Sequence, residues 1–258
     1  MPHFLIKSED IIDNKIVVED KDLYKHIIKV MRSRVGEKIK FLDENEIQYE
    51  ANISEIENSK FICEIKNQYK SERKLPLDLY VAQAVLNSDD QISAIQKATE
   101  LGVKGIYPLY SDNCSVKESF IKNKIEKWQK IVIESVKQCE RADIPTVFDI
   151  TYLKDLMDKF DTIIVFAERN ADKNFFEYVK ENKIDKNGKI LVIIGPEGGF
   201  SQREFDYFKQ NNLPLITLGN LIYRADTALC AGLTAVINGV LNDWFYPKDR
   251  ARWSFKTN

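Results

Sequence analysis

The sequence predicts a two-part α/β protein, in which a small β-rich domain precedes a larger domain with a mostly parallel sheet. Residues 3–70 contain several short strand-like runs around one helical run, which is typical of a small barrel. Residues 71–76 break that pattern with polar side chains and Pro76. From residue 77 onward, strand-like and helix-like runs alternate, which is the order of a parallel sheet. We therefore expect domains at 1–70 and 77–258, joined by a linker at 71–76.

The first domain is predicted to wrap strands around a single helix. Asp20 is placed to cap a helix from Lys21 to Met31. The apolar spacing of that helix predicts one buried face, formed by Leu23, Ile27, Ile28 and Met31. Short alternating apolar runs predict strands at residues 3–6, 15–18, 38–42, 47–56 and 60–66.

The second domain is predicted from the alternation of apolar runs and capping signals. Gly102 is expected to end one helix in the left-handed conformation. Ser201, followed three residues later by Glu204, forms a capping box that starts another. We expect strands at residues 77–85, 103–109, 145–148, 162–166, 190–194 and 213–218. We expect further helices at residues 89–101, 119–140, 174–179 and 226–244.

Composition excludes several classes of protein. The 258 residues are 44% hydrophobic and 30% charged with a net charge of −2, so there is no global signal for nucleic acid or membrane. No apolar run approaches the length of a membrane span, and the first residues do not resemble a signal peptide. Four widely separated cysteines and two histidines make a zinc site improbable. We expect no metal, no membrane partner and a reduced, cytoplasmic setting.

One local charge asymmetry interrupts this balance. Six basic residues and a single acid, Glu37, lie between positions 25 and 40; the basic residues are Lys25, Lys29, Arg32, Arg34, Lys38 and Lys40. Such a run can contact the phosphates of RNA or DNA. It is also common at a solvated helix end, where cations complement the helix dipole. The pattern alone favours the solvated helix end slightly and leaves the nucleic-acid interpretation open.

Two strand ends run into glycine turns, Gly195-Pro196-Glu197-Gly198-Gly199 and Gly219-Asn220. In open α/β sheets ligands bind where strands end in this way. The first turn is neither a P-loop nor a dinucleotide fingerprint, because neither spacing is present. Its glycines permit positive φ and close approach of a ligand to the backbone, so a ligand loop and a structural turn are equally open.

Three polar segments lie near the predicted strand and helix ends. Gln138-Cys139-Glu140-Arg141 ends a long helix, where Arg141 either projects toward a ligand or meets the helix dipole. In Arg224-Ala225-Asp226-Thr227, the arginine is either solvated or aimed at a ligand beside a helix cap. Glu168-Arg169 follows a strand and is most simply a pair of charged side chains in contact with water.

Taken together and in order, these segments resemble the bacterial 16S rRNA (uracil-N3) methyltransferases of the RsmE type, in the SPOUT superfamily. The resemblance covers nearly the whole chain, and it is the ordered set that is specific. It is carried by His26–Arg32 with Gly36-Glu37, Gln96–Val103, Lys127-Trp128, Gln138–Arg141 with Pro145, Ile194–Ser201, and Leu218-Gly219 with Arg224, Thr227 and Ala228.

The resemblance implies a PUA-like β-barrel that binds RNA, followed by a SPOUT domain with a C-terminal trefoil knot. It implies a homodimer that uses S-adenosylmethionine and produces N3-methyluridine in the decoding region of 16S rRNA in the small ribosomal subunit. The cofactor is expected to be held largely by backbone groups of the glycine turns. The residues so implied are Gly195, Pro196, Glu197, Gly198, Gly199, Leu218, Gly219, Ile222, Tyr223 and Arg224.

Roles for individual residues follow as expectations. Arg224 is our first choice for a cation that stabilises the uridine anion, and Glu197 is expected to act as a base, as a partner for the cofactor's positive charge, or only to shape its turn. Gln138 and Arg141 are candidates for holding the nucleotide. Phosphates flanking the target are expected to contact the basic residues of the first domain, Lys25, Lys29, Arg32 and Arg34.

The chain departs from the family pattern at two places. Asn87-Ser88-Asp89-Asp90 stands where the family usually has a Lys-Gly-Asp/Glu-Arg-like segment, and an arginine of the family is absent from residues 220–227, where Asp226 replaces a glutamate. These changes predict weaker RNA binding or slower turnover. They leave two alternatives: a SPOUT methyltransferase for tRNA or another rRNA site, and a non-catalytic RNA-binding assembly protein.

Overall fold

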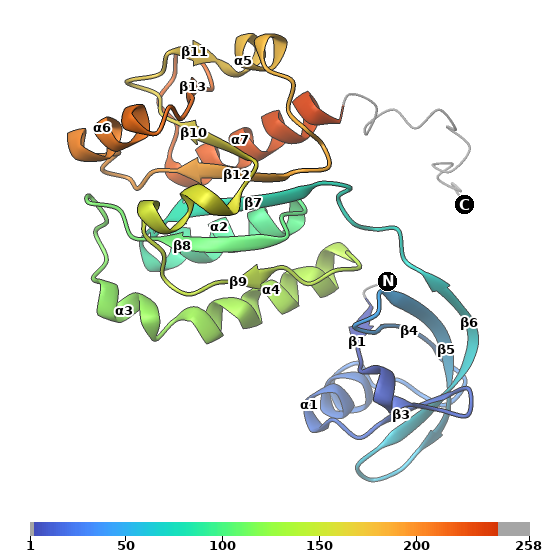
Figure 1. Ribbon diagram of the computed structural model, residues 1–258. Helices are drawn as coiled ribbons and strands as arrows, with labels where there is room; N and C mark the ends of the chain where they lie inside the picture. Colours follow the sequence, from blue (N-terminus) through green and yellow to red (C-terminus); the bar gives the residue numbers. More distant parts are fainter. Residues whose placement is uncertain (1–2, 242–258) are drawn as a thin grey trace. The chain divides into compact units, whose positions relative to one another are not determined.

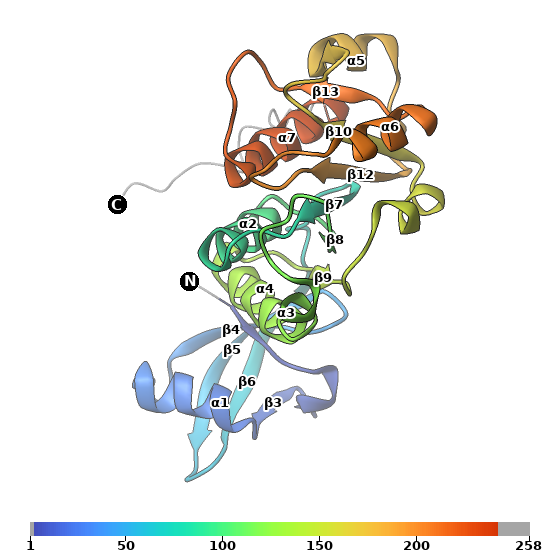
Figure 2. The same cartoon turned by 90° about the vertical axis from the view of Figure 1, so that its left-hand side faces the viewer.

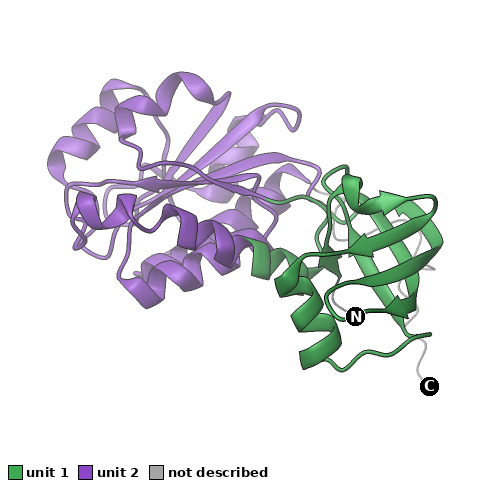
Figure 3. Cartoon of the chain, turned by 90° about the horizontal axis from the view of Figure 1, so that it is seen from below, with its two compact units in different colours: residues 1–74, 133–144 green, residues 75–132, 145–258 purple. Residues whose placement is uncertain are grey.

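The structure is a computed structural model that describes residues 3–241, and the chain falls into two compact units. Unit 1 comprises residues 1–74 and 133–144, and unit 2 comprises residues 75–132 and 145–258 (Figure 3). The C-terminal part of one long helix, from residue 133, therefore belongs to unit 1.

Unit 1 is built on a curled, barrel-like sheet with strand order β1-β4-β5-β6-β3-β2. Neighbouring strands are antiparallel except β1 and β4. Inward-facing side chains such as Ile16, Phe41 and Phe61 are fully buried and form its core. The strands are β1 (Phe4–Leu5), β2 (Ile11–Ile12), β3 (Lys15–Val18), β4 (Lys38–Leu42), β5 (Ile47–Ile56) and β6 (Phe61–Lys70). The sequence predicts the bounds of β3, β4 and β5 correctly, whereas β2 has no counterpart in the prediction.

The helix of unit 1 changes form after its first turn. The α-helix α1 (Lys21–Tyr24) begins as predicted, with Asp20 Oδ1 accepting a hydrogen bond of 2.7 Å from the nitrogen of Leu23. The next six residues form a π-helical turn, η2 (Lys25–Val30). This wider turn changes which side chains face inward. Ile27 is fully buried, but Met31 is 43% exposed, so the prediction that Met31 joins the apolar face is wrong.

Unit 2 contains a seven-stranded sheet in which all paired strands are parallel (Figure 1). Its order is β11-β13-β10-β12-β7-β8-β9. The strands are β7 (Asp78–Ala84), β8 (Gly105–Leu109), β9 (Thr146–Val147), β10 (Thr162–Phe166), β11 (Lys173–Asn174), β12 (Lys189–Ile194) and β13 (Leu215–Thr217). Apart from the two-residue strand β11, each of these strands lies within or close to a predicted run, so the alternation of apolar runs identified the sheet.

Helices cover this sheet, and α2 packs against α7 (Figure 2). The helices are α2 (Ser88–Glu100), α3 (Glu118–Lys122), α4 (Ile125–Cys139), α5 (Phe175–Glu181), α6 (Gln202–Gln210) and α7 (Ala225–Val240). Short 3₁₀ turns complete the chain at η1 (Ser8–Asp10), η3 (Leu153–Asp155) and η4 (Met157–Lys159). The left-handed cap at Gly102 (φ +91°) and the capping box of Ser201 and Glu204 are confirmed.

Two helix predictions differ from the structure. The single helix predicted at residues 119–140 is interrupted at residues 123 and 124, which separate α3 from α4. The final helix is described as far as Val240, and its predicted extension to Trp244 lies outside the described residues. Within the described part of the chain, no helix combines the length and apolar character needed to cross a bilayer.

The sheet register brings four strand ends into one row. Ile194 of β12 pairs with Gln83 of β7 on one side and with Phe166 of β10 on the other, and Phe166 also pairs with Ile216 of β13. Because these strands are parallel, the loops that follow them leave the sheet at the same edge. Segments that are far apart in the sequence are thus placed around one space.

Candidate functional site

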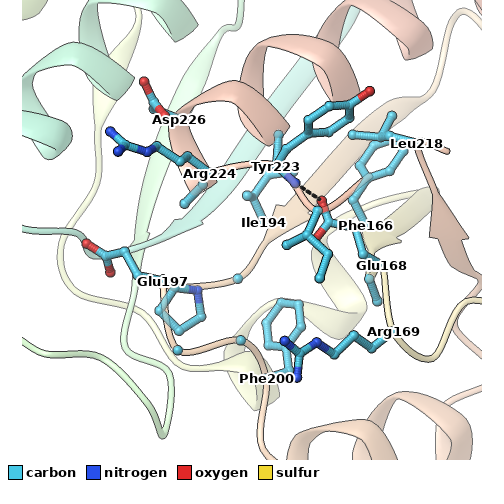
Figure 4. A pocket seen from close by; sticks show the side chains of 18 of the residues that line it. Phe166, Glu168, Arg169, Ile194, Glu197, Phe200, Leu218, Tyr223, Arg224 and Asp226 are labelled. Carbon is cyan, nitrogen blue, oxygen red and sulfur yellow. Dashed lines mark hydrogen bonds between the residues drawn. The ribbon is translucent and has the colours of Figure 1, made fainter. Parts of the chain in front are cut away.

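The loops at this edge of unit 2 enclose a cavity of about 780 Å³ (Figure 4). Its walls combine apolar side chains with carboxylates and two arginines. The lining comes from the segment after β7 (Leu86, Asn87, Asp90), from β10 and the residues after it (Phe166–Asn170), from β12 and the turn after it (Ile194–Phe200), from α6 (Phe205), and from β13 through the start of α7 (Ile216, Leu218, Ile222–Asp226, Ala228).

The glycine turn after β12 is anchored at both ends. Gln83 Nε2 donates to the carbonyl oxygen of Gly195 at 3.3 Å, and Asn113 Nδ2 donates to that of Gly199 at 2.9 Å. The nitrogen of Gly199 closes the turn by donating to Pro196 O at 2.9 Å. Gly199 has φ +71°, a conformation that side chains other than glycine rarely adopt. Hydrogen bonds from Gln83 and Asn113 therefore fix the two ends of the turn.

The second turn follows β13 and is fastened to the end of β10. The nitrogen of Gly219 donates to Thr217 Oγ1 at 3.1 Å, and Gly219 has φ +139°. The nitrogen of Tyr223 donates to Glu168 Oε1 at 3.1 Å, which is the dashed contact in Figure 4. Between these anchors Ile222 is 67% exposed. The sequence signal for Glu168 was a carboxylate close after the end of a buried strand. That signal alone predicted only a charged side chain in contact with water.

Two carboxylates of the cavity have defined partners. Glu197 Oε1 accepts hydrogen bonds from the backbone and side-chain nitrogens of Asn87, at 3.3 and 3.2 Å. Asp226 Oδ2 lies 2.8 Å from Lys97 Nζ. The hydrogen bond from Lys97 lowers the pKa of Asp226, and the same bond raises the pKa of Lys97. Asp226 is therefore already paired with a cation from α2.

The two arginines of the cavity are in a different state. Arg224 and Arg169 are exposed, and neither forms an ion pair with any described residue. Arg224 is the N-cap residue of α7, and its side chain makes no capping hydrogen bond. Asp226, the carboxylate nearest to Arg224 in the sequence, pairs with Lys97. It forms no ion pair with the guanidinium of Arg224. An anion that enters the cavity can thus meet an uncommitted cation.

The structure gathers most of the residues that the resemblance implied for the cofactor. Nine of them line the cavity: Gly195, Pro196, Glu197, Gly198, Gly199, Leu218, Ile222, Tyr223 and Arg224. Gly219 is not in the lining and instead shapes the turn through its backbone conformation. Asn87, Glu168, Phe166 and Phe200 belong to the site as well, although sequence analysis assigned none of them a role there.

The predicted RNA-contacting residues all lie in unit 1. Lys25, Lys29, Arg32 and Arg34 are exposed, and none forms an ion pair with a described residue. Gln138 is exposed at the end of α4. Arg141 is only 5% exposed, and its Nε and Nη2 donate to the two carboxylate oxygens of Asp143 at 3.1 and 2.7 Å. The structure thus presents five of these six side chains to solvent and holds Arg141 inside.

The cavity fits S-adenosylmethionine by its chemistry. Phe166, Ile194 and Phe200 offer apolar surface to an adenine ring. The backbone nitrogens of Leu221 and Ile222 donate no hydrogen bond to a described residue and are free for polar atoms of a ligand. Glu168 and Glu197 have no cationic partner among the described residues, and they match the positive sulfonium and ammonium groups. Within residues 3–241, no cluster of three or more His, Cys, Asp or Glu side chains could hold a metal ion.

Known sequences and structures resemble the chain over most of its length. A profile of an RNA methyltransferase PUA domain matches residues 18–66, and one of an RNA methyltransferase domain matches residues 73–237. The ribosomal RNA small subunit methyltransferase E of Bacillus subtilis (strain 168) is 27% identical, over 82% of this chain and 85% of that protein. The protein of the same name from Aquifex aeolicus (strain VF5) is 30% identical, over 90% of this chain and 97% of that protein.

A solved structure supports the same conclusion. The crystal structure of a ribosomal RNA small subunit methyltransferase E from Neisseria gonorrhoeae bound to S-adenosyl methionine has a TM-score of 0.78 and 25% identity, covering 92% of this chain and 96% of that one. These matches confirm the predicted fold class, an α/β methyltransferase domain with a parallel sheet preceded by a PUA-like domain. By its sequence and its fold, the chain belongs to the ribosomal RNA small subunit methyltransferase E family of RNA methyltransferases.

Proposed function

We propose that this protein transfers the methyl group of S-adenosylmethionine to N3 of a uridine in the 16S rRNA of the small ribosomal subunit. The observation that carries the proposal is the cavity at the carboxyl edge of the sheet, which two glycine turns line together with Arg224, a cation that has no ion pair among residues 3–241. Membership of the family and the chemistry of the cavity walls support S-adenosylmethionine as the donor. The uridine and its place in the decoding region come from the family resemblance.

The donor supplies an electrophilic methyl group, and the protein contributes position and charge. Glu197 is held by Asn87 through Oε1, and Oε2 makes no hydrogen bond to a described residue. We assign Glu197 Oε2 the role of accepting the proton of N3. N3 then forms its bond to the methyl carbon as the carbon–sulfur bond breaks. Arg224 stabilises the negative charge that N3 and the neighbouring carbonyl oxygens share.

Binding of rRNA is assigned to the first part of the chain. We propose residues 1–70 as the RNA-binding domain, 71–76 as the linker and 77–258 as the methyltransferase domain. Exposed, unpaired cations support this, because they release counterions when they meet phosphates. Gln138 is proposed as an additional RNA contact. Arg141 is proposed to hold the segment after Gln138 in place through its bond to Asp143. An affinity for rRNA that did not change with salt concentration would rule this assignment out.

The remaining features implied by the family are also proposals. A homodimer in the cytoplasm, where small subunits are available, is expected to appear as twice the chain mass in sedimentation equilibrium. A trefoil knot is supported by the path of the chain, since β13 lies beyond β10 whereas α7, which follows it, packs against β12 and α2. An experimental structure in which residues 218–240 pass outside the neighbouring loops would exclude the knot.

The deciding experiment is methyl transfer from labelled S-adenosylmethionine to small ribosomal subunits that lack N3-methyluridine, with free tRNA as the control. Label recovered as N3-methyluridine in 16S rRNA is the expected result. Label only in tRNA would keep the fold and overturn the substrate. Donor binding without any transfer would point to the changes at residues 87–90 and 220–227. A protein that binds rRNA but not the donor would instead be an assembly protein.

A further inference from the structure

A short loop in unit 1 presents almost all of its side chains to solvent. The loop, which we call the basic–apolar loop, comprises residues 29–35, which include the last two residues of η2 and lie between α1 and β4 (Figure 2). Six of its seven residues are exposed: Lys29, Val30, Met31, Arg32, Arg34 and Val35. Ser33 is only 7% exposed, and its nitrogen donates to the carbonyl oxygen of Ile27 at 3.1 Å. The loop is thus pinned at its centre, and the residues on both sides face outward.

The backbone of this loop is held in an uncommon conformation. The π-helical turn η2 leads into it, and Met31 N donates to His26 O at 2.9 Å. Arg32 has φ +58°, in the left-handed region that residues other than glycine rarely adopt. The nitrogen of Glu37 donates to the carbonyl oxygen of Arg34 at 3.1 Å. Backbone strain of this kind and π-helical turns are both concentrated at functional positions.

The exposed side chains are of two kinds. Val30, Met31 and Val35 are 64%, 43% and 59% exposed, which is a high density of apolar surface for so short a segment. Arg32 and Arg34 stand among them without an ion pair to any described residue. A surface that only gripped phosphates would gain nothing from the apolar members. A surface that only met another apolar protein face would have to desolvate the cations.

We propose that the basic–apolar loop grips an unpaired nucleotide of RNA, either bulged or in a single strand. An unpaired nucleotide offers both a phosphate and an apolar base face, whereas a paired one hides its base face inside the duplex. The base packs against Met31 and Val35, and the plane of Arg32 or Arg34 stacks on it. Lys25 and Lys29 hold the adjoining phosphates. This proposal rests on the proposed function, from which the occupant is taken to be RNA.

The test compares two RNA hairpins of equal length and charge, one fully paired and one with a single unpaired nucleotide, by fluorescence anisotropy with the full chain. The double substitution Met31→Ser/Val35→Ser is expected to weaken binding of the bulged hairpin by about tenfold, which is the scale of one lost stacking contact. Binding of the paired hairpin stays within about twofold, and the dependence on salt concentration is unchanged. Ile12→Ser, which changes an apolar residue of unit 1 that is 56% exposed and outside the loop, leaves both affinities as they were.

The cationic half of the loop gives a separate signature. Arg32→Gln/Arg34→Gln is expected to weaken binding of both hairpins and to reduce the slope of log affinity against log salt by about 0.7–0.9 per charge removed. Equal losses for both hairpins in Met31→Ser/Val35→Ser, or no loss, would overturn the proposal. A changed oligomeric state of that variant in sedimentation would assign the surface to a second copy of the chain instead. Since the anisotropy measurement needs neither donor nor transfer, its failure is distinct from failure of the methylation assay.

Discussion

Asn87 and Glu197 tie together two loops of the cavity that are 110 residues apart in the sequence. The backbone nitrogen and the side-chain nitrogen of Asn87 both donate to the same carboxylate oxygen, Glu197 Oε1. Asn87 stands where relatives in the family are expected to carry a lysine. Here an uncharged amide thus holds the glutamate in place, and the second carboxylate oxygen of Glu197 makes no hydrogen bond to a described residue.

Removing this contact should loosen the glycine turn. Asn87→Ala is expected to raise KM for S-adenosylmethionine by about five- to tenfold, the scale of one typical hydrogen bond, with a smaller fall in kcat. Asn87→Asp should do more harm, because it places a second carboxylate beside Glu197. Steady-state kinetics and calorimetric titration of the donor check both values. Asn187→Ala, at an exposed position away from the cavity, is the matched control; an unchanged KM in Asn87→Ala would contradict the anchoring role.

Arg224 is predicted to act on the transition state rather than on donor binding. Arg224→Ala should reduce kcat by about 10²–10³, which is typical of losing a group that stabilises a developing anion. The Kd for S-adenosylmethionine should change by no more than about threefold, because Arg224 is assigned to the charge that develops on the uridine and not to a group of the donor. Single-turnover rates and equilibrium titrations separate the two effects. Arg203→Ala, at an exposed arginine on α6, serves as control. Equal losses in kcat and in donor affinity would remove Arg224 from the role assigned here.

Glu168 is predicted to position the second turn through the backbone of Tyr223. Glu168→Ala removes the acceptor and should raise KM for the donor by about tenfold. Glu168→Gln keeps an acceptor oxygen and should recover most of the loss. Hydrogen exchange of the Tyr223 amide, measured without donor, should be faster in Glu168→Ala only. Glu181→Ala, at an exposed glutamate on α5, is the control. If Glu168→Gln were as impaired as Glu168→Ala, the charge of Glu168 rather than its hydrogen bond would matter.

The pair of Lys97 and Asp226 should make stability depend on pH at the acid end. The pKa of Asp226 is lowered in the folded protein by the hydrogen bond from Lys97, so the stabilisation is present above the ordinary aspartate value of about 3.9 and is lost as pH falls through the folded value. The pKa of Lys97 is raised, so the stabilisation that Lys97 contributes to the folded state is lost only as pH rises through that raised value. Thermal unfolding of Lys97→Met should show a smaller decline in Tm between about pH 5 and pH 3 than the parent protein. A parallel decline in both proteins would show that the pair contributes nothing there.

Local signals identified the elements of the fold well where neighbours in sequence determine them. The capping box of Ser201 and Glu204, the cap at Asp20 and the strand at residues 162–166 depend on contacts within a few residues, and all three are confirmed. Met31 was misplaced because its exposure depends on the π-helical turn, which no apolar spacing reveals. The interruption between α3 and α4 likewise has no glycine or proline to signal it.

The candidate site was predictable in part for the same reason. Its glycine turns consist of consecutive residues and were found from the sequence pattern, and the family resemblance implied their role in holding the cofactor. Asn87 and Glu168 were not found, because each acts on a segment far away in the chain, on Glu197 and on Tyr223. The sequence predicted that Arg141 either projects toward a ligand or meets the helix dipole, yet the side chain is buried and bonded to Asp143 two residues later. The sheet register and the turns determine which residues form such hydrogen bonds, and the residue types alone do not reveal them.

The row of strand ends from Gln83 to Ile216 has a consequence for the synthesis of the protein on the ribosome. The cavity walls come from residues 86 through 228, so they converge only after the sheet has brought together segments spread over more than 140 positions of sequence. Contacts of such long range form slowly, because the loop entropy is lost before the contacts are gained. A ribosome that makes this protein therefore releases both segments of unit 1, residues 1–74 and 133–144, before it releases a chain able to hold a methyl donor. The chain therefore becomes able to bind the donor only late in its synthesis, after residue 228 has been made.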